Sequence, residues 1–334
     1  MRTGKLNSEE LKDAVLSRIE HRRDEVITGA ALGEDCASFR SDGLILISGD
    51  PVTGETSKIG GLAIRVAAND IWAGGGEPFL VMLTIIAPVT YTPEDIKKIM
   101  TDAEAEAKAQ NIEIAGGHTE FSDAVNRVIV CCTALGKAAK HFKVKSASVG
   151  ESIVVTKYIG LEGTALLAEA FAERLENSLG KDAVEEALSL AKLTDVSAES
   201  KIARRCGITS MHDITEGGIY GAVSELCEGA GVGARLYTDK IPVLPVTKAV
   251  CAELGADPYR LISSGSMLIT TKDPGVLIEA LSKAGIKASV VGEITEGKPT
   301  AIDGGNEITL DVRADELFRL TQTAEKTRQR SVTS

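Results

Sequence analysis

The sequence predicts a two-domain protein in which an α+β domain is followed by an α/β domain. Its 334 residues exceed the usual size of a single domain. Helix-like and strand-like patterns alternate in both halves, and a polar, basic stretch over 137–150 separates them. We therefore expect domains over residues 1–145 and 146–334.

The first half contains three predicted helices and four predicted strands. Helices are predicted where apolar residues recur every three or four positions, over 7–22, 58–73 and 93–109. Asn7 with Glu10, and Thr92 before Pro93, are patterns that begin helices. Apolar runs predict strands over 44–47, 79–87, 113–115 and 127–136. We expect one sheet with helices on one face.

The second half begins with a predicted strand over 152–156, followed by a glycine turn that opens a helix. Alanine-rich helices continue to about residue 205, and a further helix ends near Glu228. Strands are predicted near 234–237, 267–271, 288–292 and 307–310. This order indicates a second layer of helices and strands.

The composition excludes several classes of protein. Net charge is −11, without a basic stripe, so we expect no nucleic-acid partner. The sequence shows no signal peptide and no apolar run near 18 residues, so we expect a cytoplasmic protein without membrane contact. None of the six cysteines forms a CxxC pair, and we interpret them as small buried side chains in a reducing compartment.

Acidic and polar residues recur next to turns in the first half. Asp35 lies in a glycine loop, Asp50 follows a strand, and Asn69-Asp70 lies on an otherwise apolar helix. His118 and Glu120 follow a double glycine. Any one aspartate is explained by a turn or cap. As a set, carboxylates from separate segments predict a divalent cation that carries phosphates.

Two glycine segments and one histidine leave alternatives open. Gly160–Thr164 and Thr215–Gly218 both precede helices, which suits phosphate binding but equally suits plain turn geometry. The sequence has neither a Walker A motif nor GxGxxG. His212-Asp213 is interpreted as an acid–base or metal pair, or as a helix cap.

Together these segments resemble the PurM-like, AIR synthase-related superfamily over nearly the whole chain, and within it most closely the HypE group of hydrogenase maturation proteins. Each match is short, and the order and spacing along one chain are specific. The matching segments are Gly33–Ala37, Ser48–Asp50, Asn69–Ile71, Gly74–Pro78, Gly116–Glu120, His212–Gly218, Asp257–Tyr259 and Ser264–Gly265.

The resemblance implies a PurM-like fold whose N-terminal domains pair in a homodimer and close a β-barrel. It also implies ATP and Mg²⁺ as cofactors, and phosphoryl transfer to an oxygen of an amide-like or other small substrate. Carried over by position, it implies metal ligands at Asp35, Asp50, Asp70 and Glu120. It implies a nucleotide site that includes Asp35, Asn69, Asp70, Gly117, Gly160 and Gly163. It implies catalytic roles for Asp50, His118 and Asp213.

The chain departs from this pattern at two places. HypE proteins modify a cysteine at their own C-terminus, whereas no cysteine follows Cys251 here. We therefore expect the substrate to be a separate small molecule or a protein thiol. His118 stands where kinase-type relatives have a carboxylate, which argues against the alternative of a thiamine-monophosphate kinase type of enzyme. A second alternative is a nucleotide-binding regulatory or maturation partner without turnover.

Overall fold

The computed structural model describes residues 4–31, 37–54, 58–311 and 313–321. The chain forms two compact units, Met1–His141 and Phe142–Ser334. The predicted boundary at 145/146 lies four residues beyond this division and stays a prediction. Each unit has its own sheet, so the predicted two-domain fold of mixed helices and strands is confirmed.

Unit 1 is built on a five-stranded sheet in the order β1-β6-β5-β7-β4. β5 and β6 are parallel, and the other neighbours are antiparallel. The strands are β1 (Gly4–Lys5), β4 (Leu44–Gly54), β5 (Glu77–Pro88), β6 (Glu113–Ser122) and β7 (Val128–Ala138). A separate pair, β2 (Val26–Thr28) and β3 (Ser38–Phe39), precedes β4.

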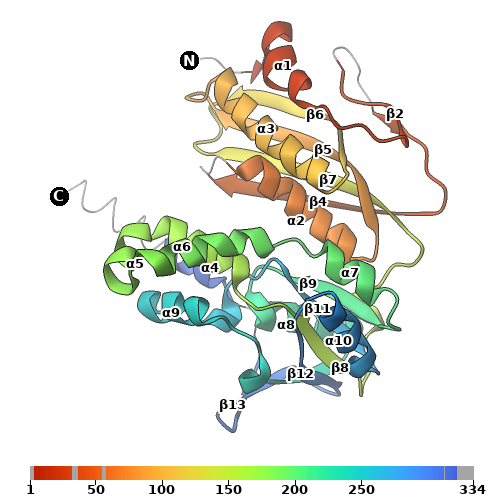
Figure 1. The fold of residues 1–334 in the computed structure, drawn as a ribbon, viewed down its shortest axis with the longest axis vertical. Coiled ribbons are helices and arrows are strands. Elements are labelled where there is room, and N and C mark those ends of the chain that lie inside the picture. The colour runs from red at the N-terminus through yellow and green to blue at the C-terminus, as the bar shows by residue number, and fades with distance from the viewer. Residues whose placement is uncertain (1–3, 32–36, 55–57, 312, 322–334) are drawn as a thin grey trace. The chain divides into compact units, whose positions relative to one another are not determined.

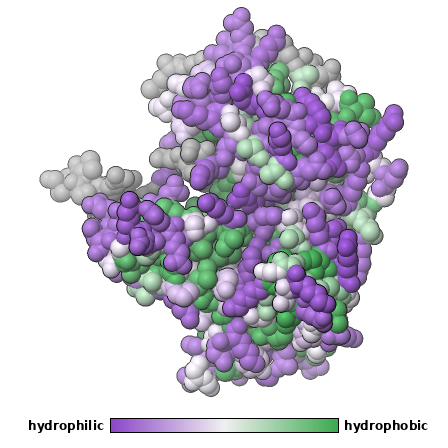
Figure 2. Space-filling view, viewed as in Figure 1, coloured by the Kyte–Doolittle hydropathy of each residue, from purple (hydrophilic) through white to green (hydrophobic). Residues whose placement is uncertain are grey.

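Helices cover one face of this sheet, as predicted (Figure 1). They are α1 (Ser8–Ala14), the 3-10 turn η1 (Leu16–Arg18), α2 (Ile59–Ala73) and α3 (Pro93–Ala109). Both predicted helix starts are confirmed, because Asn7 and Thr92 each form a reciprocal cap with the third helical residue. The solvent side of these helices is largely hydrophilic (Figure 2).

The predicted helix over 7–22 is wrong in its length, because α1 ends at Ala14. The buried carboxylate of Glu104 on α3 accepts the backbone N–H groups of Glu20 and His21, at 3.0 and 2.5 Å. Those N–H groups therefore bond to a distant side chain instead of continuing a helix. Sequence periodicity cannot reveal such a partner, which lies 84 residues away from Glu20.

The opposite face of the sheet carries apolar side chains without a covering helix. Along β7 the even-numbered residues from Val128 to Gly136 are buried against the helices, whereas the odd-numbered ones are half-buried. Ile47 on β4 is 68% exposed and Met82 on β5 is 39% exposed. We call this side of the five-stranded sheet the open face.

Two segments that lie just beyond predicted strands belong to those strands in the structure. Ser48-Gly49-Asp50 is part of β4, and Gly116–Glu120 is part of β6. Glycine pairs usually mark turns, so the sequence pattern predicted strands that stop too early. Inside a strand, successive side chains point to opposite faces, which decides where the site residues lie.

Unit 2 contains a seven-stranded sheet in the order β14-β13-β10-β12-β8-β11-β9. Only β10 and β13 are parallel neighbours among these described strands. The strands are β8 (Ser152–Thr156), β9 (Ser210–Ile214), β10 (Gly233–Tyr237), β11 (Ser266–Thr271), β12 (Ala288–Thr295), β13 (Thr300–Asp303) and β14 (Asn306–Thr309).

The helices of unit 2 form two groups around separate apolar cores. One core joins the sheet to α8, and the other lies among α4, α5, α6 and α9. The helices are α4 (Leu161–Ala170), α5 (Ala172–Leu179), α6 (Lys181–Ser189), α7 (Ser197–Ala203), α8 (Gly218–Ala230), α9 (Pro245–Leu254) and α10 (Pro274–Lys283). Across the described part of the chain, no helix combines the length and the apolar character that a membrane span needs.

Candidate functional site

Asp50 lies on β4 with its side chain on the helix-covered face of the sheet. It pairs in register with the buried Cys132 on β7, which faces the same side. Burial raises the pKa of the Cys132 thiol, and the neighbouring Cys131 and Asp50 add to the effect. Among the described residues, Oδ2 of Asp50 is buried and has no hydrogen-bond partner. A buried carboxylate oxygen without a donor is costly, so a ligand there would stabilise it.

Asp70 lies on α2 above the same face. The hydroxyl of Ser48, two residues before Asp50 on β4, donates a hydrogen bond of 2.5 Å to Oδ2 of Asp70. Residues two apart on a strand share a face, so Asp50 and Asp70 flank Ser48 on one side of the sheet. Asn69, beside Asp70, is 1% exposed and faces the interior.

His118 and Glu120 lie on β6 with their side chains on the open face. Their side chains contact each other, with Nε2 of His118 3.2 Å from Oε2 of Glu120. They pair with Thr84 and Ile86 of β5, which are half-buried on that face. The sheet therefore separates His118 and Glu120 from Asp50 within one copy of the chain.

A hard cation such as Mg²⁺ prefers carboxylate oxygens, and Asp50 and Asp70 supply them on one face. Within residues 4–31, 37–54, 58–311 and 313–321, no three His, Cys, Asp or Glu side chains are grouped closely enough to hold a metal. Asp35, the remaining predicted ligand, lies outside the described residues. Of the predicted metal ligands, only Asp50 and Asp70 lie on the same face in the described part of the chain. Their role as metal ligands stays a prediction.

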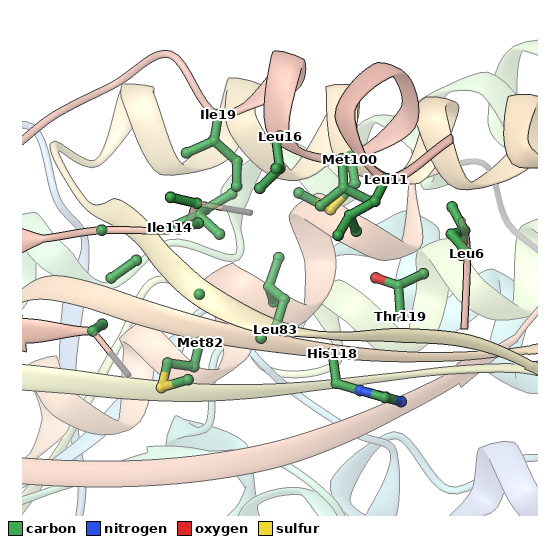
Figure 3. Close-up of a pocket in the computed structure, with 18 residues that line it drawn as sticks. Leu6, Leu11, Leu16, Ile19, Met82, Leu83, Met100, Ile114, His118 and Thr119 are labelled. Atoms are coloured by element: carbon green, nitrogen blue, oxygen red, sulfur yellow. The ribbon is translucent and has the colours of Figure 1, made fainter. Parts of the chain in front are cut away.

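A cavity of about 320 Å³ lies in unit 1 over strands β5 and β6, and neither Asp50 nor Asp70 is among the residues that line it. Figure 3 shows Leu83 and Thr119 pointing toward Leu11 and Met100, whereas His118 lies on the other side of the strands. The floor includes Gly117, whose φ is 148° and whose added Cβ would lie 1.8 Å from the carbonyl oxygen of Leu83. Glycine is therefore required at this position.

The predicted phosphate turn at Gly160 has its donors already in use. The N–H of Gly160 donates to Oγ of Ser263 at 2.6 Å, and the N–H of Gly163 donates to the carbonyl of Ile262 at 3.0 Å. A Cβ on Gly163 would lie 2.4 Å from Leu261. Both glycines thus serve close packing here, which is the plain geometric alternative. Nucleotide binding by Gly160 and Gly163 stays a prediction, and the hydrogen bonds of their N–H groups do not support it.

Asp213 lies on β9 and is 5% exposed. Its neighbour His212 contacts Glu225 on α8, with Nε2 3.0 Å from Oε2, and its Nδ1 lies 3.7 Å from Oδ1 of Asp213. Burial opposes protonation of His212, but the hydrogen bond to Glu225 and the charge of Asp213 outweigh burial and raise its pKa. Both residues belong to a strand, so the helix-cap alternative for His212-Asp213 is wrong.

Two further polar residues near these turns, Ser263 and Asp315, were not predicted from the sequence. Ser263 is fully buried between the two glycine turns, and Asp315 is 1% exposed and accepts the N–H of Gly217 at 2.7 Å. Asp315 precedes a helical turn over 316–321, and its Oδ1 accepts the N–H of Leu317 at 2.8 Å. That local capping pattern could have been read from the sequence, but the bond to Gly217 could not.

Comparisons with known proteins agree with this architecture. Residues 12–138 match the family model "AIR synthase related protein, N-terminal domain", and residues 148–304 match its C-terminal counterpart. A hydrogenase expression/formation protein of Methanocaldococcus jannaschii is 27% identical over 305 residues, which cover 88% of this chain and 89% of that protein. Carbamoyl dehydratase HypE of Escherichia coli is 26% identical over 297 residues, covering 86% and 85%.

Among solved structures, the chain is similar to the hydrogenase maturation protein HypE in complex with ATP. The TM-score is 0.77 at 16% identity, and the match covers 95% of this chain and 97% of that one. At this identity the likeness shows the fold alone. The two family matches together span most of both units.

Proposed function

This chain belongs to the AIR synthase related protein family, and from that premise we propose that it is an ATP- and Mg²⁺-dependent enzyme of the HypE type. The proposed reaction transfers a phosphoryl group from ATP to an oxygen of an amide-like substrate. Relatives named carbamoyl dehydratase and a related structure with ATP support this proposal. Such a reaction needs positioning and charge neutralisation more than covalent catalysis.

The observation that carries the proposal is the buried oxygen of Asp50. Oδ2 has no hydrogen-bond donor among the described residues, and Asp70 adds a second carboxylate on the same face. Two nearby carboxylates repel each other unless a cation lies between or beside them. Bound Mg²⁺ would neutralise the phosphates of ATP, while Ser48 keeps Asp70 oriented.

The cavity over β5 and β6 supports a nucleotide as the ligand of unit 1. Its volume of about 320 Å³ is at the lower end of small-molecule sites, and its wall is formed mainly by aliphatic side chains. The hydroxyl of Thr119 and the backbone of Gly116 and Gly117 supply polar groups at its floor. We assign the cavity to the base of ATP, which is a flat group with an apolar face.

The open face supports the proposed homodimer. Ile47 and Met82 are exposed there, and half-buried Ile129 lies on the neighbouring strand, whereas Leu135 at the other end of that strand packs against the buried cluster of Phe79, Leu80 and Ala115. An uncovered apolar sheet face is unfavourable in water, so pairing with the same face of a second copy would bury it. His118 and Glu120 would then lie at or near the interface.

Three of the five described cysteines support a separate substrate. Cys132, Cys227 and Cys251 are buried, whereas Cys131 and Cys206 are half-buried. Burial raises the pKa of Cys227 to about 11 and that of Cys251 to about 12. Such thiols are poor nucleophiles and poor acceptors. We therefore propose that the group that is dehydrated belongs to a small molecule or to the thiol of another protein.

Calorimetric titration of ATP with and without Mg²⁺ tests the proposal, for wild type, Asp70→Ala and the exposed control Asp42→Ala. We expect Mg²⁺-dependent binding that Asp70→Ala abolishes and Asp42→Ala keeps. Phosphate release is then measured with an S-carbamoyl cysteine peptide. If no ATP binds with any divalent metal ion, the proposal is refuted. Binding without turnover would favour a regulatory nucleotide-binding protein.

A further inference from the structure

The turn between β9 and α8 follows directly after Asp213. Gly217 and Gly218 have φ values of 80° and 61°, so both lie in the left-handed region. An added Cβ on Gly218 would lie 2.5 Å from the carbonyl oxygen of Tyr259. Two consecutive glycines have little conformational preference of their own, so contacts from outside the turn must fix its shape.

Ser263 supplies one of these contacts. Its backbone N–H donates to the carbonyl of Thr215 at 3.3 Å, and its hydroxyl accepts the N–H of Gly160 at 2.6 Å. The same hydroxyl donates to the carbonyl of Leu261 at 2.9 Å. One buried serine thus holds the turn after Asp213 and the turn before α4 together.

Asp315 supplies the other contact from a distant part of the sequence. Its Oδ2 accepts the N–H of Gly217 at 2.7 Å, and the backbone of Ile262 also donates to it. The residue lies 11 positions beyond the family match, which ends at 304. Asp315 therefore lies outside the part of the chain that the family model matches.

The position of Asp315 is costly for a merely structural residue. Burial raises the pKa of Asp315 to about 6, with the charge of Glu216 adding to the effect and the bonds from Leu317 and Gly217 opposing it. An apolar side chain would anchor the segment without this penalty. The carboxylate lies at the N-terminal end of α8, where it fixes the direction of the Gly217 N–H. An apolar side chain cannot do this.

We propose that Asp315 is a positioning residue for the reaction: by holding Gly217 and Ile262, it fixes the turn after β9 and with it the carboxylate of Asp213. This inference rests on the proposed function and on the predicted catalytic role of Asp213. Asp315 itself touches neither substrate nor cofactor in this assignment. Its effect reaches the reaction through the four peptide bonds that join Gly217 to Asp213.

The test compares Asp315→Asn with Asp311→Asn, a control that removes an exposed carboxylate from the same segment. Turnover of ATP is measured with Mg²⁺ and the S-carbamoyl cysteine peptide, and kcat is separated from KM. The amide signal of Gly217 is followed in protein labelled with [15N]glycine. We expect Asp315→Asn to shift that signal and to lower kcat by about tenfold or more with little change in KM for ATP. Asp311→Asn should change neither.

Asp315→Glu keeps the charge and moves it by one methylene, so it should recover part of kcat. If Asp315→Asn melts below the assay temperature, Asp315→Glu replaces it and should itself lower kcat. A folded variant with a shifted Gly217 signal and an unchanged kcat would overturn the inference alone. Wild-type protein without turnover would overturn the proposed function and this inference with it.

Discussion

The hydroxyl of Ser48 on β4 donates a 2.5 Å hydrogen bond to Oδ2 of Asp70 on α2. This bond fixes a carboxylate that we assign to Mg²⁺, and residues that orient metal ligands typically change metal affinity by 10- to 100-fold. We predict that Ser48→Ala weakens Mg²⁺-dependent ATP binding by about tenfold. Calorimetry measures this change. The exposed Ser38→Ala should bind as wild type, and equal affinity for all three proteins would contradict the assignment.

Filling the cavity of unit 1 should block the nucleotide. Leu11 on α1 lines the cavity, whereas the next residue, Lys12, is exposed. We predict that Leu11→Trp weakens ATP binding by about tenfold or more, because the indole occupies the volume assigned to the base. Lys12→Trp is the matched control and should leave affinity unchanged. Equal ATP affinity of the two variants would show that the base of ATP binds at another site.

A charge on the open face should prevent pairing of two copies. Ile47 is 68% exposed on this face, and Ile27 on β2 is 59% exposed elsewhere in unit 1. We predict that Ile47→Glu sediments as a monomer under conditions in which wild type and Ile27→Glu sediment as dimers. Analytical ultracentrifugation measures the masses. A monomeric wild type would remove the homodimer from the proposal.

Asp315 should give the stability of unit 2 a distinctive pH dependence. Burial raises its pKa from 3.8 to about 6, so the folded protein binds this proton more tightly than the unfolded chain does. Its contribution is therefore most favourable below pH 4 and is lost as the pH rises through about 6, a change of about 3 kcal/mol.

Asp315→Asn removes this titration. We predict that the stability of the variant relative to wild type improves as the pH is raised from 4 to 7. Denaturant unfolding at several pH values measures the difference. A difference that does not vary with pH would show that Asp315 has an ordinary pKa.

Ser263→Ala should destabilise the protein, because it leaves the buried N–H of Gly160 without an acceptor. An unsatisfied buried donor costs about 1–3 kcal/mol. Ser282 on α10 is exposed, so Ser282→Ala is a control that should change stability little. Unfolding in urea compares the two variants. Equal stability would mean that water or a rearranged turn satisfies Gly160.

The sequence predicted the kind and order of most elements, because apolar periodicity and capping residues are local signals. The strand over 152–156 and the helix Pro93–Ala109 have the predicted bounds. The strand β9 was missed, since Met211-His212-Asp213 shows no alternation of apolar and polar residues long enough to indicate a strand.

The candidate site was predicted in its residue types but not in its geometry. Gly116-Gly117 suggested a loop, and the continuous strand β6 instead directs His118 to the face opposite Asp50. Asp315 could not be assigned, because only tertiary structure brings it to Gly217, 98 residues earlier. A hydrogen bond between two residues far apart in the sequence produces no periodic pattern of residue types, so the sequence does not reveal it.

The ladder between β4 and β7 joins eleven consecutive residue pairs, from Leu44 with Ala138 to Gly54 with Val128, without a register shift. Side chains alternate along it, so the same strand presents Ser48 and Asp50 to one face and Ile47 to the other. Inserting or deleting one residue between Leu44 and Ile47 would exchange these faces for part of the strand. A carboxylate would then enter the surface assigned to self-association, and an isoleucine would enter the site assigned to the metal. One small change in length would therefore damage both properties together, so we expect this stretch to keep its length among working relatives.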